Sequence, residues 1–264
     1  MIAECGFTAH SNADDTQVYI STPASGHSDA MRRLSECITR IRDWMACNRL
    51  KLNEDKTQTI WLGTRHQLSK VTTHVLTLPN ATVQFSGVVN DLGVLLNSQL
   101  TMADHVAALS RSSHMRQLRS INQSLSSEAT TKLISSRLDY CNSLLVGVSG
   151  QLLHRLQVIQ NAAARLVTGA TRYEHMTPVL RSLRWLPVRH RIMFKTAVTV
   201  YKCLHGLTPP CLTEYCTSTS SAAGRRHLRS AYTRQLIILR TRTSYDDRSF
   251  AVHGPVVWNS PAVN

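Results

Sequence analysis

The spacing of the apolar residues changes near residue 100, and this change constrains the fold more than any other feature of the sequence. Before Thr101, short runs with strand propensity are separated by turn residues, with one helical segment from Ser28 to about Asn48. From Thr101 onward, apolar residues recur every three or four positions, as on one face of a helix. The sequence therefore predicts an α+β chain whose second part is mainly helical.

The first part is expected to contain two hairpins. One joins Ala3–His10 to Gln17–Ser21, and the other joins Ala81–Phe85 to Val88–Leu95. A further strand is expected at Gln58–Leu62. Trp44 and Trp61 are expected in the core, because large aromatic side chains bury much apolar area.

The second part is expected to be a helical bundle. The predicted helices run from Thr101 to about Ile121, from Ser126 onward, over Gly150–Thr168 and over Val188–Leu204. Ser126 is a good N-cap residue and Gly169 a good C-terminal stop. Residues 211–264 are expected to form a flexible basic tail, with Phe250–Asn259 and its Trp258 apolar enough to dock.

The net charge of +14 is unevenly distributed along the chain. Residues 1–100 contain nine basic and nine acidic side chains, whereas residues 101–264 contain 21 basic and seven acidic ones. Arginine is much commoner than lysine, which suits bidentate contacts with phosphate. The charge favours a polyanionic partner such as nucleic acid, although a merely solvated basic surface would have the same composition.

The seven cysteines show no spacing typical of a disulfide framework, so we expect reduced thiols in an intracellular protein. Cys203, His205, Cys211 and Cys216 could be considered as a zinc site, but they lack the usual Cys-x2-Cys spacing. Neither a membrane span nor a signal peptide is expected.

Asp14 and Asp15 form an adjacent carboxylate pair between two runs of strand propensity. Neighbouring carboxylates repel each other unless a cation neutralises them, and a pair of divalent metals does so in polymerases. Taken alone, such a pair is more often a solvated turn. Its context must therefore decide between these two interpretations.

Several downstream segments follow in a characteristic order. They are Trp44–Asn53, Lys56-Thr57, Val89–Leu96, Leu138–Leu145, Leu156–Leu166, Leu183–Ile192, Leu204–Pro210 and Ser249–Asn259. Together with the Asp-Asp hairpin, this succession resembles the reverse transcriptase of non-LTR (LINE-type, jockey-like) retrotransposons, from the metal-binding hairpin to the C-terminus.

The resemblance implies a partial polymerase palm at 1–100, a helical thumb and post-thumb region at 101–210 and the basic tail at 211–264. Asp14 and Asp15 would be catalytic ligands of Mg²⁺, with Mn²⁺ as a substitute. Lys51 and Lys56 would approach the nucleotide phosphates. The implied partners are an RNA template and a DNA primer or target DNA, in the nucleus or in a cytoplasmic ribonucleoprotein.

A dense basic group surrounds Trp185. Its members are Arg181, Arg184, Arg189 and Arg191. Such a group could bind a phosphate backbone and stack on a base. The alternative is a solvated pair of helices with Trp185 packed inward.

Two departures from the family pattern lower the expected activity. The family usually has an aromatic residue directly before Ala-Asp-Asp, where this chain has Asn12. The third metal-binding carboxylate and the fingers are expected to lie before Met1, so the chain is expected to be an inactive fragment of a larger enzyme. The alternatives are a non-catalytic nucleic-acid-binding remnant and a functionless pseudogene product.

Overall fold

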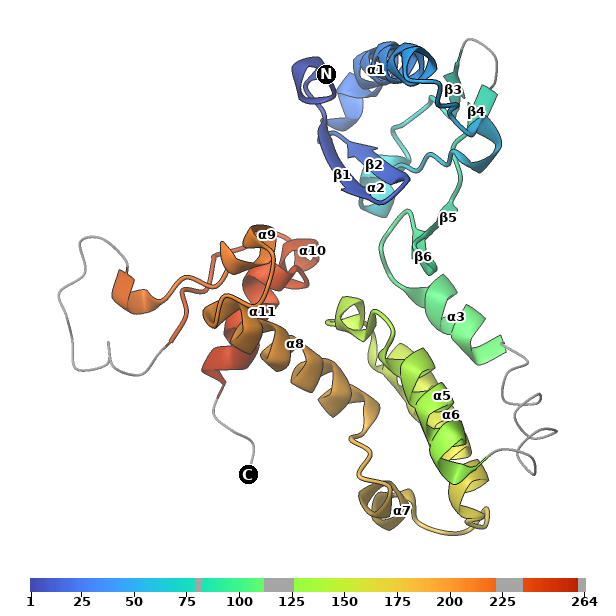
Figure 1. Cartoon of the computed structure of the whole chain (residues 1–264), viewed down its shortest axis with the longest axis vertical. Coiled ribbons are helices and arrows are strands. Elements are labelled where there is room, and N and C mark those ends of the chain that lie inside the picture. Colours follow the sequence, from blue (N-terminus) through green and yellow to red (C-terminus); the bar gives the residue numbers. More distant parts are fainter. Residues whose placement is uncertain (79–81, 112–125, 222–234, 261–264) are drawn as a thin grey trace. The chain divides into compact units, whose positions relative to one another are not determined.

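The computed structural model describes residues 1–78, 82–111, 126–221 and 235–260. The chain divides into two compact units, Met1–Asp104 and His105–Asn264 (Figure 1). The first contains all the described strands together with helices, and the second is mainly helical. This mixture agrees with the predicted α+β class.

The strands of the first unit form three separate antiparallel pairs within the described residues. The pairs are β1 (Thr8–Asn12) with β2 (Asp15–Tyr19), β3 (Val75–Thr77) with β4 (Thr82–Gln84), and β5 (Val88–Asp91) with β6 (Val94–Asn97). The first predicted hairpin is therefore confirmed, but β1 begins later than expected. Gly6, at φ 77°, ends a short 3₁₀ helix, η1 (Ala3–Cys5), before the strand starts.

The other strand predictions were wrong in their pairing. The Gln58–Leu62 segment forms a single parallel bridge, between Thr59 and Phe85, instead of a strand. Residues 88–97 fold back on themselves through Leu92 and Gly93, whose φ angles of 46° and 83° are those of a type I′ turn. That turn gives β5 its own partner, so β4 pairs with the preceding β3.

Helix α1 (His27–Cys47) lies at its predicted position and covers the core of the first unit. Met31 packs with Leu76, Leu78 and Val83, and Trp61 stacks on Phe85 with ring centroids 5.1 Å apart. Trp44 was wrongly assigned to the core, since it is 53% exposed. The remaining short elements of this unit are η2 (Ala24–Gly26), η3 (Glu54–Lys56) and α2 (Arg65–Leu68).

Five helices of seven residues or more are described in the second part of the chain, along with α3 (Ala103–Arg111) at the unit boundary. They are α5 (Ser127–Asp139), α6 (Gly150–Thr168), α7 (Met176–Ser182), α8 (Val188–Leu204) and α11 (Phe250–Asn259). The shorter elements are η4 (Asn142–Leu145), α9 (Pro210–Thr213), η5 (Thr219–Ser221) and α10 (Ser244–Asp247). The predicted continuation of α3 to Ile121 lies outside the described residues.

The bounds of α6 and α8 match the predictions because their ends carry strong local signals. The Ser149 hydroxyl accepts the Leu152 amide at the start of α6, and Gly169, at φ 71°, ends that helix. Pro187 precedes α8, and Gly206 follows it at φ 68°. Ser126 likewise accepts the Ala129 amide at the start of α5.

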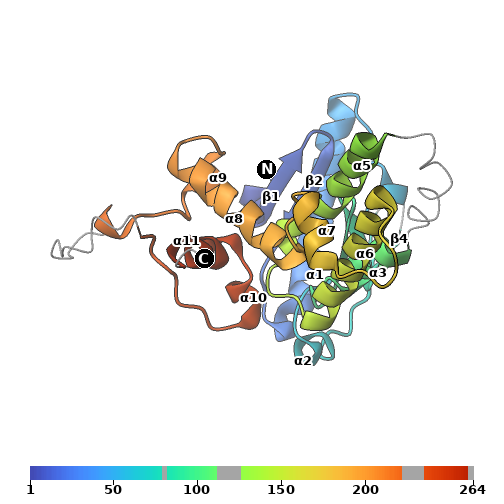
Figure 2. The same cartoon turned by 90° about the horizontal axis from the view of Figure 1, so that it is seen from below.

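Two apolar clusters stabilise the second unit. One joins α5, α6 and α7 through Ile134, Ala163, Leu180 and Trp185. The other surrounds Val200, Cys203, Cys216 and Leu236, with Phe250 and Trp258 packed against it. Through this cluster α11 lies against α8 (Figure 2), so the predicted docking of this segment is confirmed. The sequence predicts a flexible tail over residues 211–264. In the described part of that range, the helix α11 packs against α8.

No helix within the described residues combines the length and apolar character needed to cross a membrane.

Candidate functional site

The carboxylate pair lies at the tip of the β1–β2 hairpin, as the sequence predicts. Asn12 pairs with Asp15, so Ala13 and Asp14 form a two-residue turn. Ala13 takes a left-handed φ of 54°, which is strained for a residue other than glycine. Cross-strand contacts stiffen the hairpin, since Ser11 and Thr16 share a hydrogen bond of 3.1 Å and His10 bonds the Tyr19 hydroxyl at 2.8 Å.

Both carboxylates are exposed, and neither forms an ion pair with another residue in the described part of the chain. Gln17 lies two positions after Asp15, on the same face of β2. Its amide donates to the Asp91 carboxylate at 2.6 Å and so brings the end of β5 to the hairpin. This Gln17–Asp91 contact could not be predicted from the sequence, because its partners are 74 residues apart in the chain.

The donor chemistry of Asp14 and Asp15 suits Mg²⁺, which binds proteins through one or two carboxylates and retains water or substrate oxygens. Within the described ranges, no three His, Cys, Asp or Glu side chains gather closely enough to hold a metal. Asp14 and Asp15 therefore offer two carboxylates at the hairpin tip and do not belong to a cluster of three such side chains among the described residues.

Lys51 and Lys56 are exposed and lie in the same unit as the hairpin, with Lys51 before η3 and Lys56 as its last residue. Asn53 shapes this turn, since its side chain accepts the Lys56 amide at 3.2 Å and its carbonyl accepts the Thr57 hydroxyl at 2.9 Å. The two ammonium groups form no ion pair among the described residues, so they are accessible to an anion.

The basic group around Trp185 divides into exposed and structural members. Arg181, Arg184 and Arg189 are exposed, whereas the Arg191 side chain is 13% exposed. The Arg191 guanidinium makes a bidentate contact with Asp139, in which Nε donates to Oδ1 at 2.8 Å and Nη2 donates to Oδ2. Arg191 thus ties α8 to α5, and its donors are directed at Asp139.

Trp185 is 7% exposed and belongs to the α5–α6–α7 cluster. The alternative in which it packs inward is therefore confirmed, and it offers no surface for stacking on a base.

Arg184 holds an unusual backbone position. It lies just after α7 with φ 56°, its amide bonds the Arg181 carbonyl at 3.0 Å, and the Trp185 amide bonds the Leu180 carbonyl at 2.8 Å. This pair of bonds defines a Schellman motif, whose left-handed residue is usually glycine. The same motif ends α1, with Arg49 at φ 59° in the equivalent position.

A polar network beside Trp185 was missed by the sequence reasoning, which assigned apolar residues alone to the buried face of α6. Gln160 is fully buried and donates to the Leu186 carbonyl at 2.8 Å. Gln157 donates to Gln160 at 2.9 Å and accepts the amide of Val188, the first residue of α8, at 2.9 Å. The network fixes the connection between α7 and α8.

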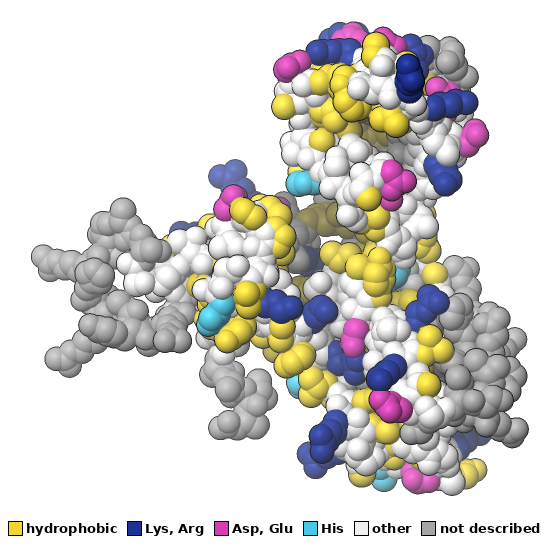
Figure 3. All heavy atoms as spheres, viewed as in Figure 1, with side chains coloured by type: hydrophobic (Ala, Val, Ile, Leu, Met, Phe, Trp, Pro, Cys, Tyr) yellow, Lys and Arg dark blue, Asp and Glu magenta, His cyan; other side chains and the backbone are white. Residues whose placement is uncertain are grey.

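An exposed face of α8 carries aromatic and basic side chains that the sequence reasoning also missed. Phe194 and Tyr201, which are 61% and 50% exposed, lie seven residues apart and so on one side of the helix. Lys195 and Lys202 are exposed beside them, and His205 stacks on Tyr201 with ring centroids 4.0 Å apart. Figure 3 shows Lys and Arg side chains at the surface of the chain, interspersed with hydrophobic ones.

The four residues considered for zinc do not meet as a metal site. Cys203 and Cys216 contact each other in the buried cluster of α8, but Cys211 and His205 are exposed. The His205 ring forms a hydrogen bond of 2.7 Å with the Tyr201 carbonyl through Nδ1.

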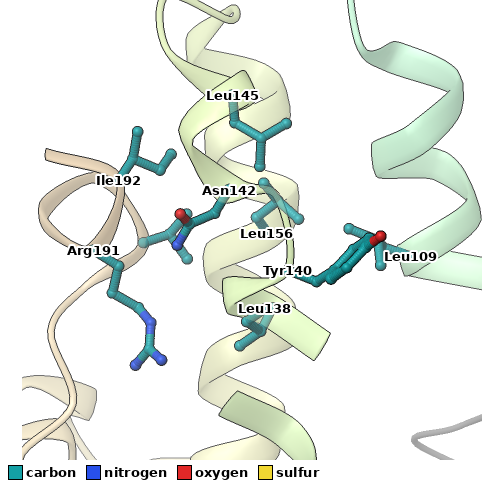
Figure 4. Close-up of a pocket in the computed structure, with 9 residues that line it drawn as sticks. Leu109, Leu138, Tyr140, Asn142, Leu145, Leu156, Arg191 and Ile192 are labelled. Atoms are coloured by element: carbon teal, nitrogen blue, oxygen red, sulfur yellow. The ribbon is translucent and has the colours of Figure 1, made fainter. Parts of the chain in front are cut away.

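A mainly apolar pocket lies among α3, α5, α6 and α8, and Figure 4 shows Asn142 between Arg191 and Leu156 within it. The Asn142 Oδ1 atom is buried and accepts no hydrogen bond within the described residues, while its amide donates to Asp139 at 3.2 Å. The donors of Arg191 are directed at Asp139, so the polar group that the pocket offers is the Asn142 Oδ1 acceptor. One acceptor in a mainly apolar lining does not identify a substrate.

The chain is similar to a transposon protein described as an RNA-directed DNA polymerase. A protein of Drosophila melanogaster described as "Probable RNA-directed DNA polymerase from transposon BS" is 28% identical to the chain over 204 residues. The aligned region is 70% of this chain but 21% of the relative, so the chain matches about a fifth of that protein's length. No family model and no solved structure matches the chain. The similarity supports a reverse transcriptase relationship.

Proposed function

We propose that this chain is a C-terminal part of a LINE-type retrotransposon reverse transcriptase and that it binds nucleic acid. The observation that carries the proposal is the similarity to a transposon RNA-directed DNA polymerase over 70% of the chain. The exposed Asp14-Asp15 pair on a hairpin turn supports it from the structure, because polymerases use such carboxylates in nucleotidyl transfer.

In this proposal Asp14 and Asp15 would hold Mg²⁺, or Mn²⁺ in its place, at the hairpin tip. Bound there, such metals would supply activation of the primer 3′-hydroxyl and charge stabilisation of the pyrophosphate leaving group. The chain's own contribution is to present both carboxylates to solvent on a hairpin stiffened by the Ser11–Thr16 and His10–Tyr19 contacts. Lys51 and Lys56 supply positive charge for the nucleotide phosphates.

The second unit would contact the RNA template and the DNA primer or target. Arg181, Arg184 and Arg189 are exposed and suit phosphate contacts. Phe194 and Tyr201 offer exposed rings on which unpaired bases can stack, with Lys195 and Lys202 beside them. Arg191 is left out of this surface because it binds Asp139.

Primer extension on an RNA template tests the catalytic part of the proposal. We expect no incorporation by this chain above that of an Asp14→Ala variant, in Mg²⁺ or in Mn²⁺. The physical reason is that two exposed carboxylates, without a third metal ligand in the described part of the chain, hold the metals weakly. Incorporation that is lost in Asp14→Ala would instead show that the chain completes a working metal site.

Arginine-to-glycine variants at the two Schellman positions test nucleic-acid binding separately from folding. Both Arg184→Gly and Arg49→Gly relieve a left-handed φ, so each should raise the free energy of unfolding by about 1 kcal/mol. Arg184→Gly alone should weaken binding to single-stranded RNA, and it should reduce the slope of log K against log[salt] by about 0.7. Thermal unfolding and RNA titrations at several salt concentrations measure the two effects.

Equal RNA affinity of the two glycine variants would remove Arg184 from the proposed interface. If the unaltered chain bound RNA with no salt dependence, or not at all, the functionless alternative would be favoured over the nucleic-acid-binding one.

A further inference from the structure

Cys5 lies against one face of α1. Arg33, Cys37 and Arg40 are spaced by four and three residues, so they share that face. Arg33 Nη2 donates to the Cys5 carbonyl at 3.0 Å, and Arg40 Nη1 donates to the Cys5 sulfur at 3.2 Å. Because Cys37 lies between the two arginines on this face, its thiol also faces Cys5.

The two sulfurs differ in accessibility. Cys5 is partly exposed, whereas Cys37 is completely buried. Burial, and then the contact with Cys5, raises the pKa of the Cys37 thiol to about 11. Arg40 is held in place by Glu4, whose carboxylate accepts from Nη2 at 2.9 Å. Cys5 is therefore an accessible thiol beside a positive charge, the surroundings in which reactive cysteines are found.

We propose that Cys5 and Cys37 form a peroxide-sensitive pair that closes to an intramolecular disulfide. In the first step the Cys5 sulfur attacks a hydroperoxide, the O–O bond breaks, and Cys5 becomes a sulfenic acid as water or an alcohol leaves. In the second step the Cys37 sulfur attacks the Cys5 sulfur, the S–O bond breaks, and the Cys37 proton leaves with the hydroxyl group as water. In total, two thiols are oxidised to one disulfide and one hydroperoxide is reduced.

A second pair of contacting cysteines provides a contrast within the same chain. Cys203 and Cys216 are 2% and 7% exposed in an apolar cluster, with no arginine donating to either sulfur among the described residues. Burial, and then the neighbouring Cys203, raises the pKa of the Cys216 thiol to about 12. The two sulfurs of this pair are close to each other, but a peroxide cannot reach them. The pair should therefore remain reduced under mild peroxide treatment.

The disulfide would connect η1 to α1, and β1 begins at Thr8, shortly after Cys5. Oxidation would therefore fix the base of the hairpin that carries Asp14 and Asp15. The inference rests on the contacts of Cys5 and does not depend on the proposed nucleic-acid function.

The test is to treat the full chain with hydrogen peroxide, block the remaining thiols with iodoacetamide and map the peptides by mass spectrometry without reduction. We expect a Cys5–Cys37 crosslink to form before the exposed Cys47 and Cys211 are oxidised. In a Cys37→Ala variant, Cys5 should accumulate as a sulfenic acid that dimedone traps. A Cys203→Ala variant is the matched control and should still form the crosslink.

Oxidation of Cys5 no faster than that of Cys47 and Cys211, with no Cys5–Cys37 peptide, would overturn the proposal. This result can be read from the unaltered chain, so it does not depend on the variants folding. A crosslink between Cys203 and Cys216 in place of Cys5–Cys37 would also overturn it, because proximity rather than access would then control the chemistry.

Discussion

Replacing Gln160 by alanine should lower the free energy of unfolding of the helical unit by about 3 kcal/mol. The side chain is fully buried in α6, and its amide donates to the Leu186 carbonyl at 2.8 Å. Truncation would leave that carbonyl without its donor and remove one of the two acceptors of the Gln157 amide, and it would open a cavity beside α6. Chemical denaturation followed by circular dichroism measures the change.

Gln151→Ala is the matched control for this experiment. Gln151 lies in the same helix but is exposed, so its replacement should change the stability by less than about 0.5 kcal/mol. If the two variants were equally stable, the Gln160 network would contribute nothing to the connection between α7 and α8.

Replacing Asp139 by alanine should cost about 2 kcal/mol of stability, because it leaves the Arg191 guanidinium without its bidentate partner. Arg191 is largely buried, but Asp139 is 39% exposed, so solvent screening keeps the cost below that of a fully buried pair. The variant also removes the acceptor of the Asn142 amide. Thermal unfolding of the variant and the unaltered chain gives the comparison.

Lys132→Ala tests whether burial rather than ion pairing sets this cost. Lys132 and Glu128 form an ion pair of 2.7 Å in the same helix α5, with side chains 76% and 75% exposed. Breaking the pair should cost less than about 0.5 kcal/mol. A loss as large as that of Asp139→Ala would mean that the partly buried geometry of Arg191 adds no stability.

Much of the helical unit could be predicted because its helix ends are marked locally. Ser149 and Gly169 delimit α6, and Pro187 and Gly206 delimit α8, independently of the rest of the fold. The hairpin tip at Asp14 was predictable for the same reason, since two short strand-forming runs flank it.

Features that depend on distant partners could not be read from the sequence. The choice of β3 as the partner of β4 depends on the turn at Leu92 and Gly93, which removes the competing pairing. Arg191 resembles its exposed neighbour Arg189 in sequence, but its partner Asp139 lies 52 residues away. Gln160 is buried in α6, but the spacing of the apolar residues in that helix predicts only apolar side chains on the buried face.

The paired strands of the first unit have a further consequence for its backbone amides. Each described sheet has two strands, so along β1 and β2 the amides that face away from the partner strand lack a ladder bond. In hydrogen–deuterium exchange, those amides should exchange rapidly, while their paired neighbours are protected up to the opening free energy of the individual hairpin. Protection in this unit would therefore alternate residue by residue along β1 and β2, whereas in α6 it would be continuous over successive turns.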